Sequence, residues 1–167
     1  MALFTRRDRP PAELVALLGP DERVVSWADT ADETVILASS LGLWWPELDG
    51  PRRISWQYVD KVVWHDHVLS VTEADVVDDT LLIDRRPVAA RLSVPRDLPP
   101  TVRKRVESNI VRTELLTIAG GAVRFVGRRQ PGRDGVYWWA RLEPGTPDTE
   151  RVRSAVRARL AILRAAN

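Results

Sequence analysis

The 167-residue chain contains no cysteine, one methionine and only two histidines. The lack of cysteine excludes disulfide bonds, zinc sites built on thiolates and cysteine nucleophiles. Its apolar runs are only a few residues long, whereas a membrane-spanning helix needs about 20 consecutive apolar residues. The N-terminal sequence MALFTRRDRPPAEL has no apolar stretch ahead of a cleavage site. We therefore expect a cytoplasmic protein with no transmembrane segment.

Signatures of catalysis and of nucleotide binding are also missing, because GxSxG, GxGxxG and GxxxxGK[ST] do not occur. The two histidines, His65 and His67, share the segment HDH, which reads as a turn and not as a metal site. The acidic stretch TEADVVDD lacks the glycine and the terminal glutamate of a calcium loop, so we expect an acidic loop. We expect no enzymatic activity, metal or cofactor, and an enzyme of unrecognised type is the alternative.

The formal net charge of +2 hides an uneven distribution of charge along the chain. Residues 1–84 contain 7 basic and 16 acidic side chains, and residues 85–167 contain 18 basic and 7 acidic ones. All but two of the basic residues are arginine, an excess that a GC-rich genome explains more simply than a function does. The uneven distribution indicates an anionic partner, head-to-tail self-association, or two halves that lie against each other.

Short β-branched and aromatic runs with a period of two follow one another from residue 22 to residue 94. The predicted strands cover residues 22–29, 33–40, 41–45, 52–57, 60–66, 67–75, 80–86 and 88–94. Seven or eight strands at this spacing predict an antiparallel sandwich or barrel. A short helix is expected before them, in PPAELVALLGP. After them, TVRKRVESNIVRTEL predicts an amphipathic helix that packs Val102, Val106 and Ile110 on the sheet.

The remaining sequence predicts a hairpin, AVRFVGRR and GVYWWARL joined by QPGRD, and a last helix. Thr146 is the expected N-cap of that helix, and its expected apolar stripe consists of Val152, Val156, Leu160 and Leu163. Arg153 and Arg157 lie on another face, whereas Arg159 falls inside the stripe and either reaches the edge or pairs with an acidic residue of another element or chain. We thus expect an α+β protein with three parts: residues 1–20 (a basic tail and a short helix), 21–114 (the β domain with its capping helix) and 115–167 (an Arg-rich hairpin–helix extension).

The order LLGPDERVVSWADT, TVILASSLGLWW, RRISWQYVDKVVWHDHVLSV and LPPTVRKRVESNIV resembles uncharacterised bacterial pleckstrin-homology-like (PH-like) proteins of actinobacterial type, over about residues 12–114. The resemblance implies a sandwich or barrel of about seven strands capped by an amphipathic helix, and an interaction or assembly role. Family members that bind phosphoinositides use Lys and Arg around the first hairpin. Here Asp29, Asp32 and Glu33 stand between the first two predicted strands, so we do not expect phosphoinositide binding. A fold alone does not assign an activity.

Tryptophan is concentrated between residues 41 and 67, with four of the seven. Strand alternation predicts that Trp56 and Trp64 are core residues. Trp44 and Trp45 are consecutive, as are Trp138 and Trp139, and neighbours in a strand face opposite sides. One member of each pair should therefore point outward, under a helix, a neighbouring chain or a ligand, and two outward tryptophans indicate a contact surface.

The C-terminal extension is the expected binding surface. The arginines of its hairpin are Arg124, Arg128, Arg129, Arg133 and Arg141, and Tyr137, Trp139 and Arg141 share one strand face. Guanidinium groups beside flat rings suit single-stranded nucleic acid, although the rings can equally be core and the arginines can pair with the acidic half. Our first hypothesis is a non-catalytic interaction or scaffold module that uses the outward tryptophans and the extension to bind a protein partner or a second copy of itself. The alternative is an RNA- or DNA-binding protein that uses the hairpin and the last helix.

Overall fold

The computed structural model describes residues 8–118 and 120–166. The basic tail expected at residues 1–7 lies outside the described residues. The helices are α1 (Ala12–Val15), the 3-10 helix η1 (Trp56–Tyr58), α2 (Leu98–Asn109) and α3 (Glu150–Ala165). The strands are β1 (Val24–Thr30), β2 (Val35–Ser39), β3 (Gly42–Trp45), β4 (Arg52–Ser55), β5 (Val59–His65), β6 (Val68–Val77), β7 (Leu81–Asp84), β8 (Val88–Val94), β9 (Ile110–Ile118), β10 (Gly121–Arg128) and β11 (Tyr137–Leu142).

All eight runs predicted as strands form strands, β1 to β8. The strands form one sheet in the order β4-β3-β2-β1-β8-β6-β7-β11-β10-β9, and β5 pairs with β6 outside this path. The sheet is mostly antiparallel, and the pairing of β11 with β7 is parallel. The predicted hairpin strands form β10 and β11 and continue the sheet through β7, so the sheet has 11 strands where about seven were expected in the β domain. The expected helix was too long, because residues 110–115 belong to β9.

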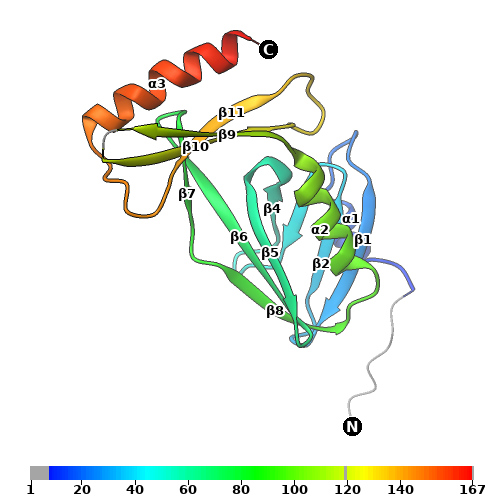
Figure 1. The fold of residues 1–167 in the computed structure, drawn as a ribbon. Coiled ribbons are helices and arrows are strands. Elements are labelled where there is room, and N and C mark those ends of the chain that lie inside the picture. The colour runs from blue at the N-terminus through cyan, green and yellow to red at the C-terminus, as the bar shows by residue number, and fades with distance from the viewer. Residues whose placement is uncertain (1–7, 119, 167) are drawn as a thin grey trace.

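The first and larger hydrophobic core lies between strands β1 to β6 and β8 and the helix α2 (Figure 1). Val102 and Val106 of α2 are buried in it as predicted, but Ile110 is the first residue of β9 and is 38 % exposed. The helix ends at Asn109 because this residue is bound to the next hairpin. Its carbonyl accepts a 2.9 Å hydrogen bond from the backbone N–H of Arg129, and its side-chain amide donates to the Arg129 carbonyl.

A second core lies between α3 and the strands β7, β9, β10 and β11. Val152, Val156 and Leu160 are buried in it, which confirms the predicted stripe. The predicted N-cap was wrong, since Thr149 caps α3 by accepting a hydrogen bond from the Val152 N–H. Thr146 instead binds the backbone of β10, because its hydroxyl accepts from Ala122 N–H and donates to Ala122 C=O, both at 2.9 Å.

The ten-residue strand β6 connects the two cores (Figure 1). Its first half pairs with β5 and β8, and its second half pairs with β7, which packs with the C-terminal elements. The boundary expected after residue 114 falls inside β9. Strand β7 therefore lies between two strands of the first core in the sequence, although it packs in the second core.

Arg128 ties the C-terminal hairpin to the first core. Its side chain is only 1 % exposed, and Nη1 donates to the Val59 carbonyl and Nη2 to Asp60, both at 2.9 Å. Burial lowers the pKa of this guanidinium, and the charge of Asp60 opposes that shift. A buried charge that keeps its partners is tolerated, whereas removal of one partner leaves the others desolvated and unpaired.

We expect Arg128→Ala to lower the free energy of unfolding by about 3–5 kcal/mol, because it leaves the buried Val59 carbonyl without its donor and leaves Asp60 paired with Arg141 alone. Arg124→Ala is the matched control on the same strand, where the pair with Glu143 is partly exposed; it should cost at most about 1 kcal/mol. Urea unfolding of both variants measures the difference. Equal losses would contradict the role given to Arg128.

Candidate interaction surface

Trp44 and Trp45 lie on opposite faces of β3, as strand alternation predicts. Trp45 is 5 % exposed in the first core. Trp44 is half-buried on the other face, where it packs with Leu14 and Leu18 of the N-terminal segment. Its indole Nε1 donates to Glu22 at 2.9 Å. The outward ring is therefore covered by a helix of the same chain, which was one of the three expected covers.

Trp138 and Trp139 lie on opposite faces of β11, as strand alternation predicts, and both are buried, at 3 % and 6 % exposed, so neither ring is open to a partner. The reason is that both faces of β11 are covered. Trp138 packs in the core under α3, and Trp139 packs between Ala74 and Leu82 and contacts Tyr58, with the ring centroids 6.0 Å apart. The interior Gly127 was a signal of this packing in the sequence, because an added Cβ there would lie 3.1 Å from Trp138.

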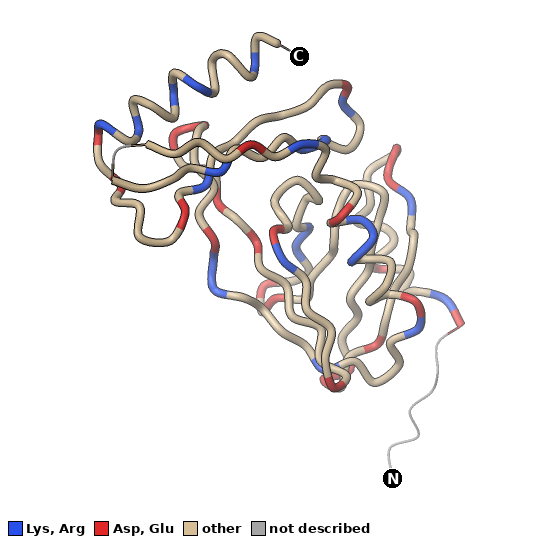
Figure 2. Tube along the Cα trace, in the orientation of Figure 1, with Lys and Arg blue, Asp and Glu red and all other residues tan. Residues whose placement is uncertain are grey.

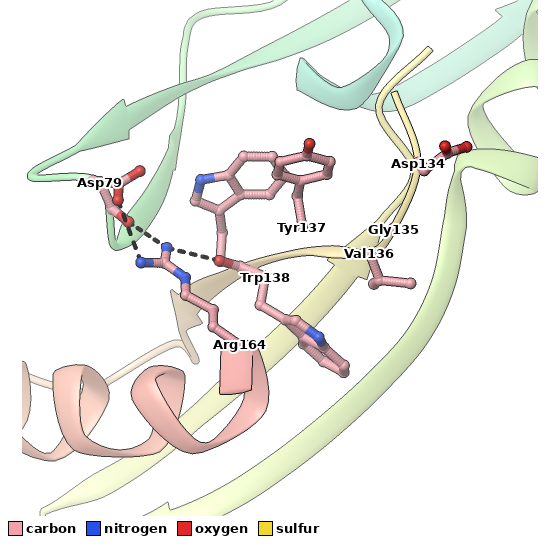
Figure 3. Close-up of a pocket in the computed structure, with 8 residues that line it drawn as sticks. Asp79, Asp134, Gly135, Val136, Tyr137, Trp138 and Arg164 are labelled. Carbon is pink, nitrogen blue, oxygen red and sulfur yellow. Dashed lines mark hydrogen bonds and ion pairs between the residues drawn. The ribbon is translucent and has the colours of Figure 1, made fainter. Parts of the chain in front are cut away.

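The cavity beside β11 shows how the aromatic residues are held (Figure 3). Arg164 of α3 reaches across it and donates to the carbonyls of Asp79 and Trp138, at 2.6 and 2.9 Å. Tyr137 stacks on Trp139 at 6.3 Å between ring centroids, on the shared face that the sequence predicted. These rings are engaged with each other and with the core, so they form no open stacking platform.

Figure 2 shows that basic and acidic positions are both spread through the folded chain. Most arginines of the expected binding surface form ion pairs within the chain, including pairs between its acidic and basic halves. The pairs are Arg124 with Glu143, Arg128 with Asp60, Arg141 with Asp60 and Asp84, Arg153 with Asp78 and Asp148, Arg157 with Glu150, and Arg159 with Glu114. Two of the candidates, Arg129 and Arg133, form no ion pair with the described residues. The uneven charge along the sequence is thus largely matched by contacts in the fold.

The acidic stretch TEADVVDD is not a loop. Glu73 and Asp75 belong to β6, and Asp78 and Asp79 form the β6–β7 turn, both with positive φ. The prediction of a turn at HDH is confirmed, because Asp66 and His67 connect β5 to β6. The strand period continues further through the acidic residues than their polarity suggested.

An apolar groove lies between β5 and α2, with a volume of about 680 Å³. It is lined by Asp60, Lys61, Val62, Val63, Trp64, Pro99, Pro100, Arg103, Val106, Glu107 and Ile110. Trp64 was expected in the core, but it is 40 % exposed, and Val63 and Ile110 are 42 % and 38 % exposed. Alternation places Trp64 on the same face as Val62, yet the ring lies near the β5–β6 turn, where it contacts His67 edge-on. Alternation therefore predicts which face of β5 the ring is on, but it does not predict that the core ends before Trp64.

The backbone of β5 forms the wall of this groove and pairs with β6 on one side only. Among the described residues, the hydrogen bonds of the β5 backbone outside its pairing with β6 are at Val59, whose N–H donates to the Trp56 carbonyl and whose carbonyl accepts from the Arg128 side chain. From Lys61 to His65 the outer edge therefore offers free N–H and C=O groups beside exposed apolar side chains. Such an edge is a template for another extended chain.

A scan against protein-family models gives no match, and searches of curated proteins and of solved structures give none either. Within residues 8–118 and 120–166, no helix combines the length and the apolar character needed to cross a bilayer. In the same part of the chain, no group of three or more His, Asp or Glu side chains is placed to hold a metal ion.

Glu22 fixes the position of the Trp44 ring and accepts hydrogen bonds from Ser39, Trp44, Gly19 and Arg53. Burial acts to raise the pKa of this carboxyl, but the hydrogen bonds and the Arg53 charge outweigh burial and hold the pKa below its ordinary value. A lowered pKa means that the ionised group stabilises the folded state above the unfolded pKa, and that this contribution is lost as the pH falls.

We therefore expect Glu22→Gln to lower the free energy of unfolding most at neutral pH, with a difference from the wild type that shrinks between about pH 5 and pH 3. Urea unfolding at several pH values measures this. The control is Glu13→Gln on α1, an exposed residue without an ion pair in the described chain. A constant difference for Glu22→Gln at all pH values would contradict the prediction.

Proposed function

We propose that this protein is a non-catalytic interaction module that binds an extended segment of a partner protein in the groove between β5 and α2. The observation that carries the proposal is the unpaired outer edge of β5 beside the exposed side chains of Val63, Trp64 and Ile110. A strand added to this edge gains backbone hydrogen bonds, and its alternate side chains enter the apolar groove.

The arrangement of the first core supports the PH-like fold that we propose for residues 21–114. Strands β1 to β6 and β8 follow the order β4-β3-β2-β1-β8-β6-β5, and α2 follows the last of them in the chain. This agrees with a seven-strand barrel closed by one amphipathic helix, and β7 is then an excursion toward the C-terminal elements. The acidic β1–β2 turn, with Asp32 and Glu33, supports our expectation that phosphoinositides do not bind there.

The occupant that we propose is another protein's extended segment with apolar residues at every second position. The rim of the groove has charges of both signs, from the basic Lys61 and Arg103 and the acidic Glu107. Arg103 already forms an ion pair with Glu107 at 2.8 Å. The rim therefore does not select one sign of charge, and the selective element is the apolar wall. A second copy of the chain is the alternative occupant.

The ion pairs within the chain weaken the nucleic-acid alternative, because they occupy most of the arginines that would bind phosphate. Of the hairpin arginines that motivated it, Arg129 and Arg133 alone are without an ion pair in the described chain, and the rings of Tyr137 and Trp139 stack on each other. Both histidines lie at the exposed β5–β6 turn, which supports a non-catalytic role over an arrangement for nucleophilic catalysis. We still expect a cytoplasmic protein.

Selection from a phage library of random 12-residue peptides against the full chain tests the proposed function. We expect enriched peptides with alternating apolar residues, and Trp64→Ala should weaken their binding about tenfold or more, because it removes the largest apolar wall of the groove. Fluorescence anisotropy of a labelled peptide measures the affinity. The matched control is Leu115→Ala, an exposed apolar residue of β9 that does not line the groove.

N-methylation of single peptide amides separates strand addition from other binding modes. Methylation should abolish binding at every second amide, where the N–H faces β5, and should be tolerated at the amides between them. Three results would overturn the proposal: no enriched peptide, equal binding to wild type and Trp64→Ala, or a dimer in sedimentation that Trp64→Ala dissociates, which would assign the groove to a second copy.

A further inference from the structure

A second cavity, of about 450 Å³, lies on a part of the molecule that the β5–α2 groove does not include. Three separate segments bring arginines to it: Arg23 precedes β1, Arg105 lies on α2, and Arg129 follows β10. None of the three forms an ion pair with the described residues, whereas most of the other described arginines do. The cavity volume is within the range of small-molecule sites, about 300–1,000 Å³.

Hydrogen bonds hold the backbone of Arg23 and Arg129, and Arg105 lies within α2, although the three guanidinium groups form no ion pair with the described residues. Arg23 is bound in both directions to Ser40, with Arg23 N–H donating to Ser40 Oγ at 3.0 Å and Ser40 N–H donating to the Arg23 carbonyl at 2.8 Å. Arg129 is bound in both directions to Asn109. Ser40 and Asn109 line the same cavity. The cationic side chains therefore extend from anchored positions.

Asn109 adds an independent indication of a ligand. Its side chain is 95 % buried, and its Oδ1 has no hydrogen-bond partner among the described residues. A buried acceptor without a donor costs free energy, so a ligand that brings an N–H or O–H group would be favoured there. The cavity thus combines cations for an anionic group with an acceptor for a donor group.

The charge balance favours an anion. Asp21 is the one carboxylate that lines the cavity beside the three arginines. The carboxyl end of α2 adds a partial negative charge of roughly half an elementary charge, which three guanidinium groups exceed. A phosphate group carries about −1.5 to −2 at pH 7, and arginine binds phosphate oxygens through paired N–H groups.

We propose that this cavity binds a small organic phosphate that also carries a hydrogen-bond donor, such as a nucleotide or a sugar phosphate. The phosphate lies among Arg23, Arg105 and Arg129, and the donor group lies at Asn109. This site is independent of the proposed peptide groove, and occupancy would connect the β10–β11 loop to the end of α2.

Isothermal titration calorimetry of the full chain with AMP, inorganic phosphate and citrate tests the site. We expect AMP to bind more tightly than inorganic phosphate, and citrate to bind most weakly. Arg105→Ala and Arg129→Ala should each weaken AMP binding about tenfold or more, because each removes a charged hydrogen-bond donor. Asp21→Asn should tighten binding, which a merely unfolded or distorted variant would not do.

Arg112→Ala is the control, since Arg112 is an exposed arginine of β9 without an ion pair in the described chain and does not line the cavity. It should leave the affinity unchanged, and Trp64→Ala should do the same. The proposal is overturned if AMP does not bind at millimolar concentration, if citrate binds as well as AMP, or if Arg105→Ala and Asp21→Asn have no effect. Binding of oligouridylate or of anionic-lipid vesicles that requires Arg105, without binding of AMP, would also overturn it and assign the cations to a polymer or a membrane.

Discussion

The buried guanidinium of Arg128 is the interaction on which the joint between the two cores depends. It extends from the C-terminal hairpin to Val59 and Asp60, the first two residues of β5. Asp60 also forms an ion pair with Arg141 at 2.8 Å. The same region contains Trp139 packed near Tyr58. Ion pairs and aromatic packing thus fix the hairpin against the first core, and this arrangement leaves the outer edge of β5 free from Lys61 onward.

The strands and the two long helices were predictable because they depend on local pattern. Alternation identified β1 to β8, and the apolar stripes identified the buried faces of α2 and α3, since these signals involve neighbours along the chain. The ends of the helices were less predictable. The C-terminal end of α2 is set by hydrogen bonds between Asn109 and Arg129. Thr146 does not cap the N-terminal end of α3, because its hydroxyl binds the backbone of Ala122. Residues distant in sequence therefore determine both helix ends.

The candidate surface was harder to predict than the fold. Burial of Trp138 and Trp139 depends on cover from α3 and from the segment around Tyr58, and the pairing of Arg159 with Glu114 joins residues far apart in sequence. Exposure of Trp64 depends on where the core ends. None of these facts follows from periodicity, because alternation specifies a face and says nothing about what covers it. The uneven charge along the chain had three expected explanations. One of them, that the two halves lie against each other, agrees with the ion pairs between the halves.

The position of β7 also constrains the order in which the protein can fold during synthesis. Leu81 is 1 % exposed, and its neighbours in the second core, such as Phe125 and Val156, are much later in the chain. When β7 leaves the ribosome, the strands and the helix that cover it have not yet been made. The first core can close as soon as α2 has been made, which is before α3 is made. Until α3 is complete, one end of the β6–β7 hairpin keeps an uncovered apolar face. Helix α3, which is made after strands β1 to β11, therefore shields an apolar segment that is made much earlier.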